Sequence, residues 1–326
     1  MRFLVLALLV LSGTVWARAP EWRWALPQGV APPPVPADNL MSAAKVELGR
    51  RLFYDADLSA DGTMACAACH EQKRGFADGN RTRPGVRGDP GRRNVPGLAN
   101  VAWLSPLTWA DPRQTTLEAQ MLVPVLGDHP VEMGMKGQEA EIVRRLGRDG
   151  CYRTMFRKAF PERRGAIDMA SIAMAVAAFE RTLVSFDSPY DRYRAGDAGA
   201  MSEAAKQGAA LFARACAGCH AGPQFTDGAF HRLEAPAQRD RGLAEVTGRA
   251  EDAGAFRTPG LRNVALGAPY FHDGSATTLG EAIDRHHLPL PVAMPVVFAF
   301  LETLTDRTFL TDPRLALPAK ACGKPL

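Results

Sequence analysis

The sequence has little of the strict alternation between apolar and polar residues that marks half-buried β-strands, so a fold built on sheets is not expected. It also lacks an excess of either charge, because 39 Lys and Arg residues against 35 Asp and Glu residues leave a formal net charge of +4. The basic residues are scattered apart from a run at 81–93, which we interpret as a solvated loop. Nucleic acid is therefore not an expected partner.

Long apolar runs are absent beyond the first residues. The segment MRFLVLALLVLSGTVWA has one positive charge, an apolar run from Phe3 to Leu11, and small residues before a plausible cleavage site after Ala17. These features predict a secretory signal peptide at 1–17. An uncleaved membrane anchor is the alternative, although the apolar run is short for a bilayer span. We expect a soluble mature protein that is exported to the periplasm.

Cysteine is scarce, with six residues in the chain. Four of them form two C-x-x-C pairs, which leaves Cys151 and Cys322. In an oxidising compartment these two could form a disulfide that ties the C-terminal tail to the first domain. Two buried free thiols are the alternative, and the sequence leaves both open.

Helical patterns account for most of what is present. Ser42 and Ser202 stand where helix N-caps are expected, and Glu203 fills a first turn. Apolar spacing or helix-forming composition predicts helices at 42–54, 115–126, 138–147, 168–186, 201–215, 278–287 and 292–304. The predicted fold class is mostly α, with long loops between the helices.

One pattern occurs twice. CAACH at 66–70 and CAGCH at 216–220 each follow a helix-like segment that ends in Leu-Phe, and each precedes Phe-x-Asp-Gly. Further along, VPGLANVA at 95–102 and TPGLRNVA at 258–265 form another matching pair. Features that recur in the same order predict a duplicated domain.

The stretch at 187–202 is rich in Gly, Asp and Ser and lies between two helical patterns, so we place a domain boundary there. We therefore expect an N-terminal domain at 18–195 and a C-terminal domain at 196–326. Because C-x-x-C-H is the attachment sequence of c-type haem, each is expected to be a cytochrome c-like haem domain.

The two motifs predict specific bonds to haem. The cysteines add to the vinyl groups of the porphyrin, and the adjoining histidine binds the iron from one face. The predicted thioethers are at Cys66, Cys69, Cys216 and Cys219, and the predicted proximal ligands are His70 and His220. A zinc site or a pair of redox dithiols is the alternative, which the duplicated context disfavours.

The second axial position on each iron separates carriers from catalysts, because an open position can bind peroxide. For the second haem the candidates are His286, His287 and Met294. For the first haem, no histidine lies between His70 and His129, and the loop at 71–95 contains no methionine.

These features resemble the bacterial di-haem cytochrome c peroxidases and their MauG-like relatives. Besides the haem motifs, the resemblance rests on GRRNVPGLANVAW, TWADPRQTTLEAQMLVPVLGDHPVEMG, FRTPGLRNVALGAPYFHDG and LGEAIDRHH. It covers nearly the whole mature chain. The family's distal ligand to the second haem lies fourteen residues after the histidine of YFHDG, which is His286 here. The resemblance thus implies a bis-histidine second haem.

The resemblance also implies an open first haem. In typical members a histidine of the loop after the first motif blocks that iron until reduction releases it, and this loop has no histidine. In this respect the chain is more similar to MauG, so we expect peroxide to react without reductive activation. Glu132 and Gln120 match the family's catalytic pair, with Glu132 moving a proton between the peroxide oxygens and Pro124 packing in the same pocket. For Glu132 and Gln120 the alternative roles are helix-end capping and solvation at the surface.

Two further sites follow from the resemblance. Trp109 matches the tryptophan that relays electrons between the two haems, although core packing is a common role for a tryptophan. Asn94, with the carbonyl oxygens of Gly267 and Pro269, matches a calcium site between the domains. The expected cofactors are two covalently bound haems c and a calcium ion.

The opening WRWALPQGVAPPPVPADNLMSAAKVELGRRLFYDADLS and the segment GDHPVEMGM resemble the MbnH-like subgroup, whose members act on a small secreted metal-binding protein. The implied function is peroxide-dependent oxidation of that partner, tryptophan to kynurenine, by a high-valent di-haem state. A peroxidase that removes hydrogen peroxide with electrons from a small cytochrome c or cupredoxin is the alternative. A non-catalytic electron carrier is a third hypothesis, which requires both irons to have two protein ligands.

Overall fold

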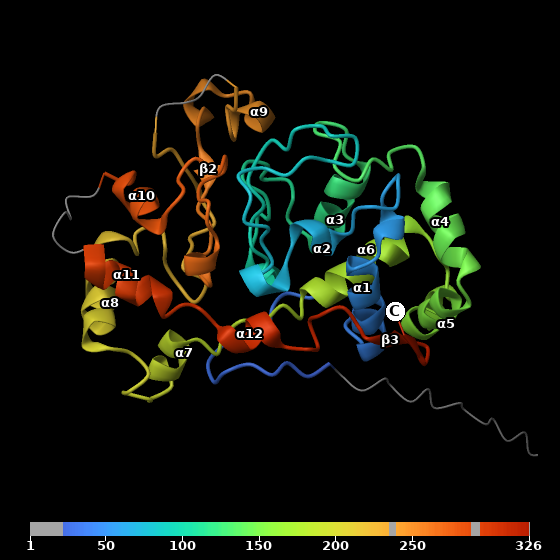
Figure 1. Ribbon diagram of the computed structural model, residues 1–326, viewed down its shortest axis with the longest axis horizontal. Coiled ribbons are helices and arrows are strands. Elements are labelled where there is room, and N and C mark those ends of the chain that lie inside the picture. Colours follow the sequence, from blue (N-terminus) through green and yellow to red (C-terminus); the bar gives the residue numbers. More distant parts are fainter. Residues whose placement is uncertain (1–21, 235–238, 288–293, 326) are drawn as a thin grey trace, which may run out of the picture.

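A computed structural model describes residues 22–234, 239–287 and 294–325 (Figure 1). The predicted signal peptide at 1–17 lies outside the described residues, as does the beginning of the helix expected at 292–304. Within the described part of the chain, no helix is both long and apolar enough to cross a membrane.

Helices dominate the described residues, as the sequence predicts. Up to residue 200 the elements are α1 (Ala43–Phe53), η1 (Ala56–Leu58), α2 (Cys66–Cys69), η2 (Gln72–Arg74), η3 (Val101–Trp103), α3 (Leu117–Leu126), α4 (Glu139–Arg148), α5 (Gly150–Ala159), η4 (Pro161–Arg163), α6 (Met169–Glu180) and α7 (Pro189–Arg194), η marking 3-10 helices. After residue 200 they are α8 (Glu203–Ala215), β1 (Phe230–His231), α9 (Ala244–Thr247), η5 (Ala250–Asp252), β2 (Phe256–Arg257), η6 (Val264–Leu266), α10 (Leu279–Asp284), α11 (Met294–Glu302), α12 (Arg307–Thr311), β3 (Lys320–Ala321) and β4 (Lys324–Pro325). The short strands pair antiparallel, β1 with β2 and β3 with β4.

The predicted N-caps are confirmed. The Ser42 hydroxyl accepts a hydrogen bond from the backbone N–H of Lys45, and the Ser202 hydroxyl accepts one from Ala205. Each bond satisfies an N–H that has no partner inside its helix.

The helix expected at 168–186 ends earlier, at Glu180. The residues that follow bond to another part of the chain, because Asn100 donates its backbone N–H to the Leu183 carbonyl and its side-chain oxygen accepts from the Ser185 N–H. These tertiary hydrogen bonds replace helical ones. Helices α5, α7 and α12 were not expected from the pattern of apolar residues.

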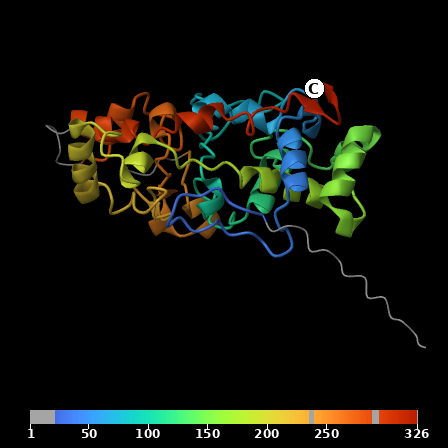
Figure 2. The same cartoon turned by 90° about the horizontal axis from the view of Figure 1, so that it is seen from below.

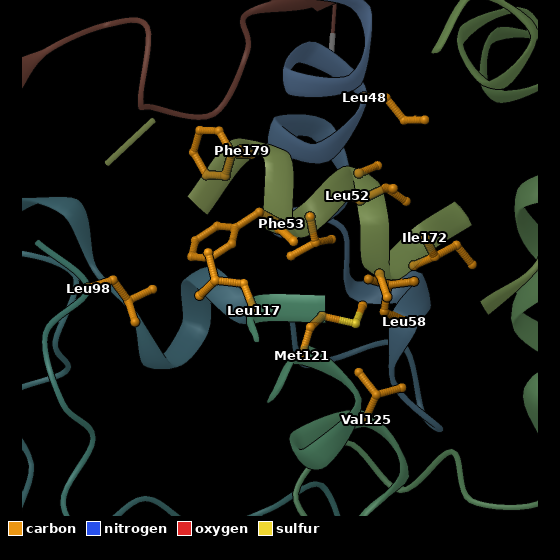
Figure 3. Close-up of a cluster of buried hydrophobic side chains, with 14 of the residues drawn as sticks. Leu48, Leu52, Phe53, Leu58, Leu98, Leu117, Met121, Val125, Ile172 and Phe179 are labelled. Atoms are coloured by element: carbon orange, nitrogen blue, oxygen red, sulfur yellow. The ribbon is translucent and has the colours of Figure 1, made fainter. Parts of the chain in front are cut away.

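Two clusters of buried apolar side chains organise the helices. In the first, α1, α3 and α6 contribute Leu52, Met121 and Phe179 among others, as Figure 3 shows. In the second, α8 and α11 contribute Phe212 and Phe300. Each cluster contacts one C-x-x-C-H motif, because Cys66 packs against the first cluster and Cys216 against the second.

A glycine sits at the crossing of each main helix pair, α1 with α6 and α8 with α11 (Figure 1). A Cβ atom on Gly49 would lie 1.8 Å from the Ala175 carbonyl oxygen, and one on Gly208 would lie 1.8 Å from the Val296 carbonyl oxygen. Only glycine permits such close approach of two helix backbones. In both halves, a glycine thus allows the close approach of two helices.

The C-terminal segment returns to the N-terminal half. Phe309 and Leu315 are buried in the first cluster, and the Tyr54 hydroxyl donates to the Leu315 carbonyl at 2.8 Å. A disulfide joins Cys151 to Cys322, with the Cα atoms 5.7 Å apart, and decides between the two alternatives left open by the sequence. Figures 1 and 2 show the red terminal segment running along the N-terminal half.

Substituting either crossing glycine should destabilise the protein. We expect Gly49→Ala and Gly208→Ala each to lower the free energy of unfolding by about 1–3 kcal/mol or more, because the methyl group forces two helix backbones apart. Gly147→Ala is the control: it lies in α4 with open space around its would-be Cβ, and alanine should stabilise the helix by up to about 1 kcal/mol. Denaturant titration measures all three, and equal midpoints for Gly49→Ala and Gly147→Ala would contradict the packing argument.

Candidate haem sites and their surroundings

Each C-x-x-C-H motif forms one tight backbone turn. The His70 N–H donates to the Cys66 carbonyl at 3.0 Å, and the His220 N–H donates to the Cys216 carbonyl at 2.9 Å. None of the four motif cysteines forms a disulfide. The turn therefore presents two thiols and one imidazole from each motif.

Both motif histidines are held by the same kind of hydrogen bond. Nδ1 of His70 lies 2.7 Å from the Phe76 carbonyl oxygen, and Nδ1 of His220 lies 3.0 Å from the Phe225 carbonyl oxygen. Because a carbonyl only accepts, Nδ1 carries the proton and Nε2 keeps its lone pair for a metal. Burial lowers the pKa of both imidazoles, which favours this neutral form.

A cavity of about 510 Å³ opens beside the second motif. Cys216, Cys219, His220 and His286 are among the residues that line it. The rings of His220 and His286 have centroids 6.2 Å apart. This leaves room for one iron with a bond of about 2 Å to a nitrogen of each ring.

The structure separates the three candidates for the distal ligand. His286 donates Nδ1–H to the Ala282 carbonyl at 2.8 Å, which leaves Nε2 free, as in the motif histidines. His287 is exposed and has a positive φ of 53°. Neither His287 nor Met294 is among the residues that line the cavity. Of the three, His286 is the one placed across from His220.

The surroundings of the first motif are different. Arg83, Glu132 and Asp78 lie close enough to Cys69 for their charges to act on the pKa of its thiol. The 71–95 loop packs on the Glu132 segment, since the Val86 N–H donates to the Glu132 carbonyl at 2.8 Å. The next histidine along the chain, His129, is exposed.

Glu132 lies beside the helix that carries the other two candidate catalytic residues. Pro124 interrupts the hydrogen bonding of α3, and its carbonyl accepts from the Met133 N–H at 2.9 Å. Gln120 is one turn before Pro124, so the two share a face of α3. Burial raises the pKa of Glu132 above the ordinary value of 4.5. The structure thus brings Glu132 to the Gln120–Pro124 segment.

Trp109 lies where the two halves of the chain meet. It lines the same cavity as His220, its indole N–H donates to the Asn94 carbonyl at 2.9 Å, and its own carbonyl accepts from the Arg257 N–H at 2.8 Å. The backbone N–H of Asn94 in turn donates to the His272 carbonyl at 2.7 Å. The indole is thus held by the Asn94 segment, and the Trp109 backbone is bonded to the C-terminal half.

The expected calcium site involves oxygens of three residues. Asn94, Gly267 and Pro269 all line the cavity. Among the described residues, no donor makes a hydrogen bond to the side-chain oxygen of Asn94 or to the carbonyls of Gly267 and Pro269. Oxygens without a donor are suitable ligands for a hard cation.

The remaining histidines have structural contacts. His231 bonds through Nε2 to Asp227 at 2.7 Å, and these two residues lie with Cys219 in one small cluster. His272 stacks on Phe256 with ring centroids 3.5 Å apart.

Comparison with known proteins agrees with this arrangement. A family model described as di-haem cytochrome c peroxidase matches residues 43–199. The methylamine utilization protein MauG of Methylophilus methylotrophus is 36% identical over 290 residues, 87% of this chain and 84% of that protein. This chain belongs to the di-haem cytochrome c peroxidase family. It is therefore a peroxidase-type oxidoreductase with two haems.

Other relatives and structures fit this membership. The cytochrome c peroxidase Ccp of Escherichia coli is 37% identical over 259 residues, 77% of this chain and 54% of that protein. The crystal structure of a MauG-like protein associated with microbial copper homeostasis has a TM-score of 0.87 at 39% identity, covering 92% of this chain and 100% of that one. The diheme peroxidase BthA of Burkholderia thailandensis, at 24% identity and a TM-score of 0.66, covers 83% of this chain and 88% of that one, and shares the fold.

Sequence reasoning missed a buried carboxyl group in the N-terminal half, that of Glu180. Glu180, the last residue of α6, is 6% exposed, and one of its carboxylate oxygens has no hydrogen-bond partner among the described residues. Burial raises the pKa of the Cys66 thiol, and the charge of Glu180 adds to this effect, which places Glu180 near the first motif. Burial raises the pKa of Glu180 itself to about 8. The apolar composition of α6, which is buried on nearly all sides, could have indicated the burial of Glu180, but no local pattern indicates that one of its oxygens lacks a partner.

Glu180 should make stability depend on pH. Because its pKa rises from 4.5 to about 8 on folding, the folded state holds the proton more tightly and stability falls as the pH rises between these values. Glu180→Gln removes this loss, so its gain over the parent should be larger at about pH 8 than at about pH 5, by a few kcal/mol at about 1.4 kcal/mol per pKa unit. Urea titrations at both pH values measure the difference. The exposed Glu162→Gln is the control, and an equal response of the two variants would contradict the assignment.

Proposed function

We propose that this protein is an exported, periplasmic enzyme that uses hydrogen peroxide to oxidise a side chain of a small secreted metal-binding protein, tryptophan to kynurenine. The observation that carries the proposal is the first haem site, where the half-buried Glu132 carboxyl of raised pKa lies near Cys69 and the adjacent loop contributes no histidine. The 39% identity to a MauG-like protein associated with copper homeostasis supports a metal-binding partner.

The haem attachment follows from the motifs. In this proposal two related domains, 18–195 and 196–326, carry one haem each. Support comes from their shared local geometry, namely the crossing glycine, the phenylalanine behind each histidine and the Nδ1–carbonyl bond. Cys66 and Cys69 with His70 hold the first haem, and Cys216 and Cys219 with His220 and His286 hold the second.

Each haem, when bound, supplies the redox chemistry that takes oxidising equivalents from peroxide. The chain supplies the proton transfer. Burial raises the pKa of Glu132, and a carboxylate of raised pKa is a better proton acceptor, so Glu132 can accept a proton from one peroxide oxygen and return it to the other. Gln120, one helical turn before Pro124 in α3, would supply an amide that can hydrogen-bond peroxide.

The segments between the two sites have connecting roles. Trp109 relays electrons between the haems; the hydrogen bond to Asn94 orients its indole, and its backbone carbonyl is bonded to Arg257 of the other half. Calcium bound by Asn94, Gly267 and Pro269 would lock the same junction, since Asn94 also holds Trp109. A protein substrate then need not enter the first haem site, because the electrons that it loses could travel to that site through the second haem domain.

The oxidised enzyme should react with peroxide without prior reduction. We expect stoichiometric peroxide added to the fully ferric protein to produce an oxidised tryptophan in the metal-binding partner encoded nearest to this protein's gene, located by peptide mass spectrometry. Partner incubated with peroxide alone is the control.

An unmodified partner, together with rapid peroxide consumption in the presence of a reduced small cytochrome c or cupredoxin, would instead favour a detoxifying peroxidase. That outcome is consistent with the E. coli relative, which is named a cytochrome c peroxidase. A ferric spectrum without any high-spin component would remove both enzymatic functions proposed for the first haem.

Removing the Glu132 carboxyl should slow the reaction with peroxide while leaving haem content unchanged. We expect Glu132→Gln to lower the rate by about 10²–10⁴-fold, the usual contribution of a general acid–base group. Stopped-flow absorbance measures the rate, and Glu162→Gln, exposed and in the same domain, serves as control. A rate within a few-fold of the parent would exclude Glu132 as the proton carrier.

A further inference from the structure

Arg257, in β2, is a buried cation without an acidic partner. The residue is 3% exposed. Its guanidinium donates to two backbone carbonyls, from Nε to Thr108 at 3.1 Å and from Nη1 to Thr258 at 3.2 Å. In the described part of the chain, no carboxylate lies within ion-pair distance of it.

Other buried arginines of the chain do have carboxylates. The closest nitrogen–oxygen distances are 2.6 Å for Arg51–Asp149, 2.8 Å for Arg181–Glu118 and 2.9 Å for Arg262–Asp191. An unpaired buried charge is costly, because neutral carbonyls compensate only part of the lost hydration. A fourth buried arginine without such a partner therefore indicates an anion that the polypeptide does not itself supply.

The position of Arg257 identifies this anion. Arg257 lines the same cavity as His220 and His286. Burial lowers its pKa to about 10, so the guanidinium still carries its charge at neutral pH. Arg285, another arginine of the lining, is already paired with Glu234 at 2.6 Å.

Haem carries two propionate carboxylates, and a planar guanidinium is the side chain best suited to bind a carboxylate through two hydrogen bonds. We propose that Arg257 binds a propionate of the haem attached at Cys216 and Cys219. This inference rests on the proposed function, in which Cys216 and Cys219 carry the second haem. Because the Arg257 N–H also donates to the Trp109 carbonyl, the same residue joins the haem edge to the segment that carries the tryptophan.

The proposal predicts an electrostatic effect on the second haem. Without the guanidinium, an uncompensated propionate near the iron favours the ferric state, so Arg257→Gln should shift the midpoint potential of the low-spin haem to a more negative value. Arg257→Lys keeps a positive charge and should retain most of the parent potential. Arg249→Gln, which removes an exposed arginine of the same half, should leave it unchanged. Spectroelectrochemical titration of the full-length holoprotein measures all four potentials.

An Arg257→Gln variant that folds, carries two haems and keeps the parent potential would overturn the proposal. Should that variant fail to fold, a crystal structure of the parent holoprotein decides: a propionate oxygen within hydrogen-bond distance of the guanidinium supports the proposal, and water or a protein carboxylate in that place refutes it. Mass mapping of haem peptides tests the attachment separately, because a haem missing from Cys216 and Cys219 would contradict the proposed function irrespective of Arg257.

Discussion

A hydrogen bond between a histidine Nδ1 and a backbone carbonyl recurs at the candidate haem sites, at His70, His220 and His286. It fixes the tautomer and the ring orientation, and so determines which nitrogen is left to bind a metal. The crossing glycines behind the motifs bring the helices close enough for the phenylalanines to pack behind His70 and His220. Helix packing, ring orientation and ligand geometry are thus linked in both halves.

The two motifs share this frame but differ in what lies across from the histidine. Opposite His220 stands a second imidazole with its own Nδ1 bond. Near Cys69 lie the half-buried Glu132 and a loop without histidine. An iron with two protein ligands suits electron transfer, whereas one with a free position can bind peroxide, and this difference is why we propose the first site for the chemistry and the second for electron storage.

Much of the local structure could be predicted from the sequence. The C-x-x-C-H motifs, the caps at Ser42 and Ser202 and the main helices depend on neighbours within a few residues, and the structure agrees with them. The prediction failed at the end of α6, where hydrogen bonds from Asn100 replace helical ones. Periodicity within α6 carries no information about a partner so far along the chain.

The sequence by itself determined the family, the haem-binding motifs and the class of reaction, because these reside in contiguous residues whose chemistry does not depend on the rest of the fold. Only the tertiary structure decided that Cys151 joins Cys322, that His286 rather than His287 lies across from His220, and that Arg257 is buried without an acid. Each of these depends on segments far apart in sequence meeting at one place. Whether a side chain is buried, and which partner it has, depends on these contacts between distant segments, and no local sequence pattern encodes them.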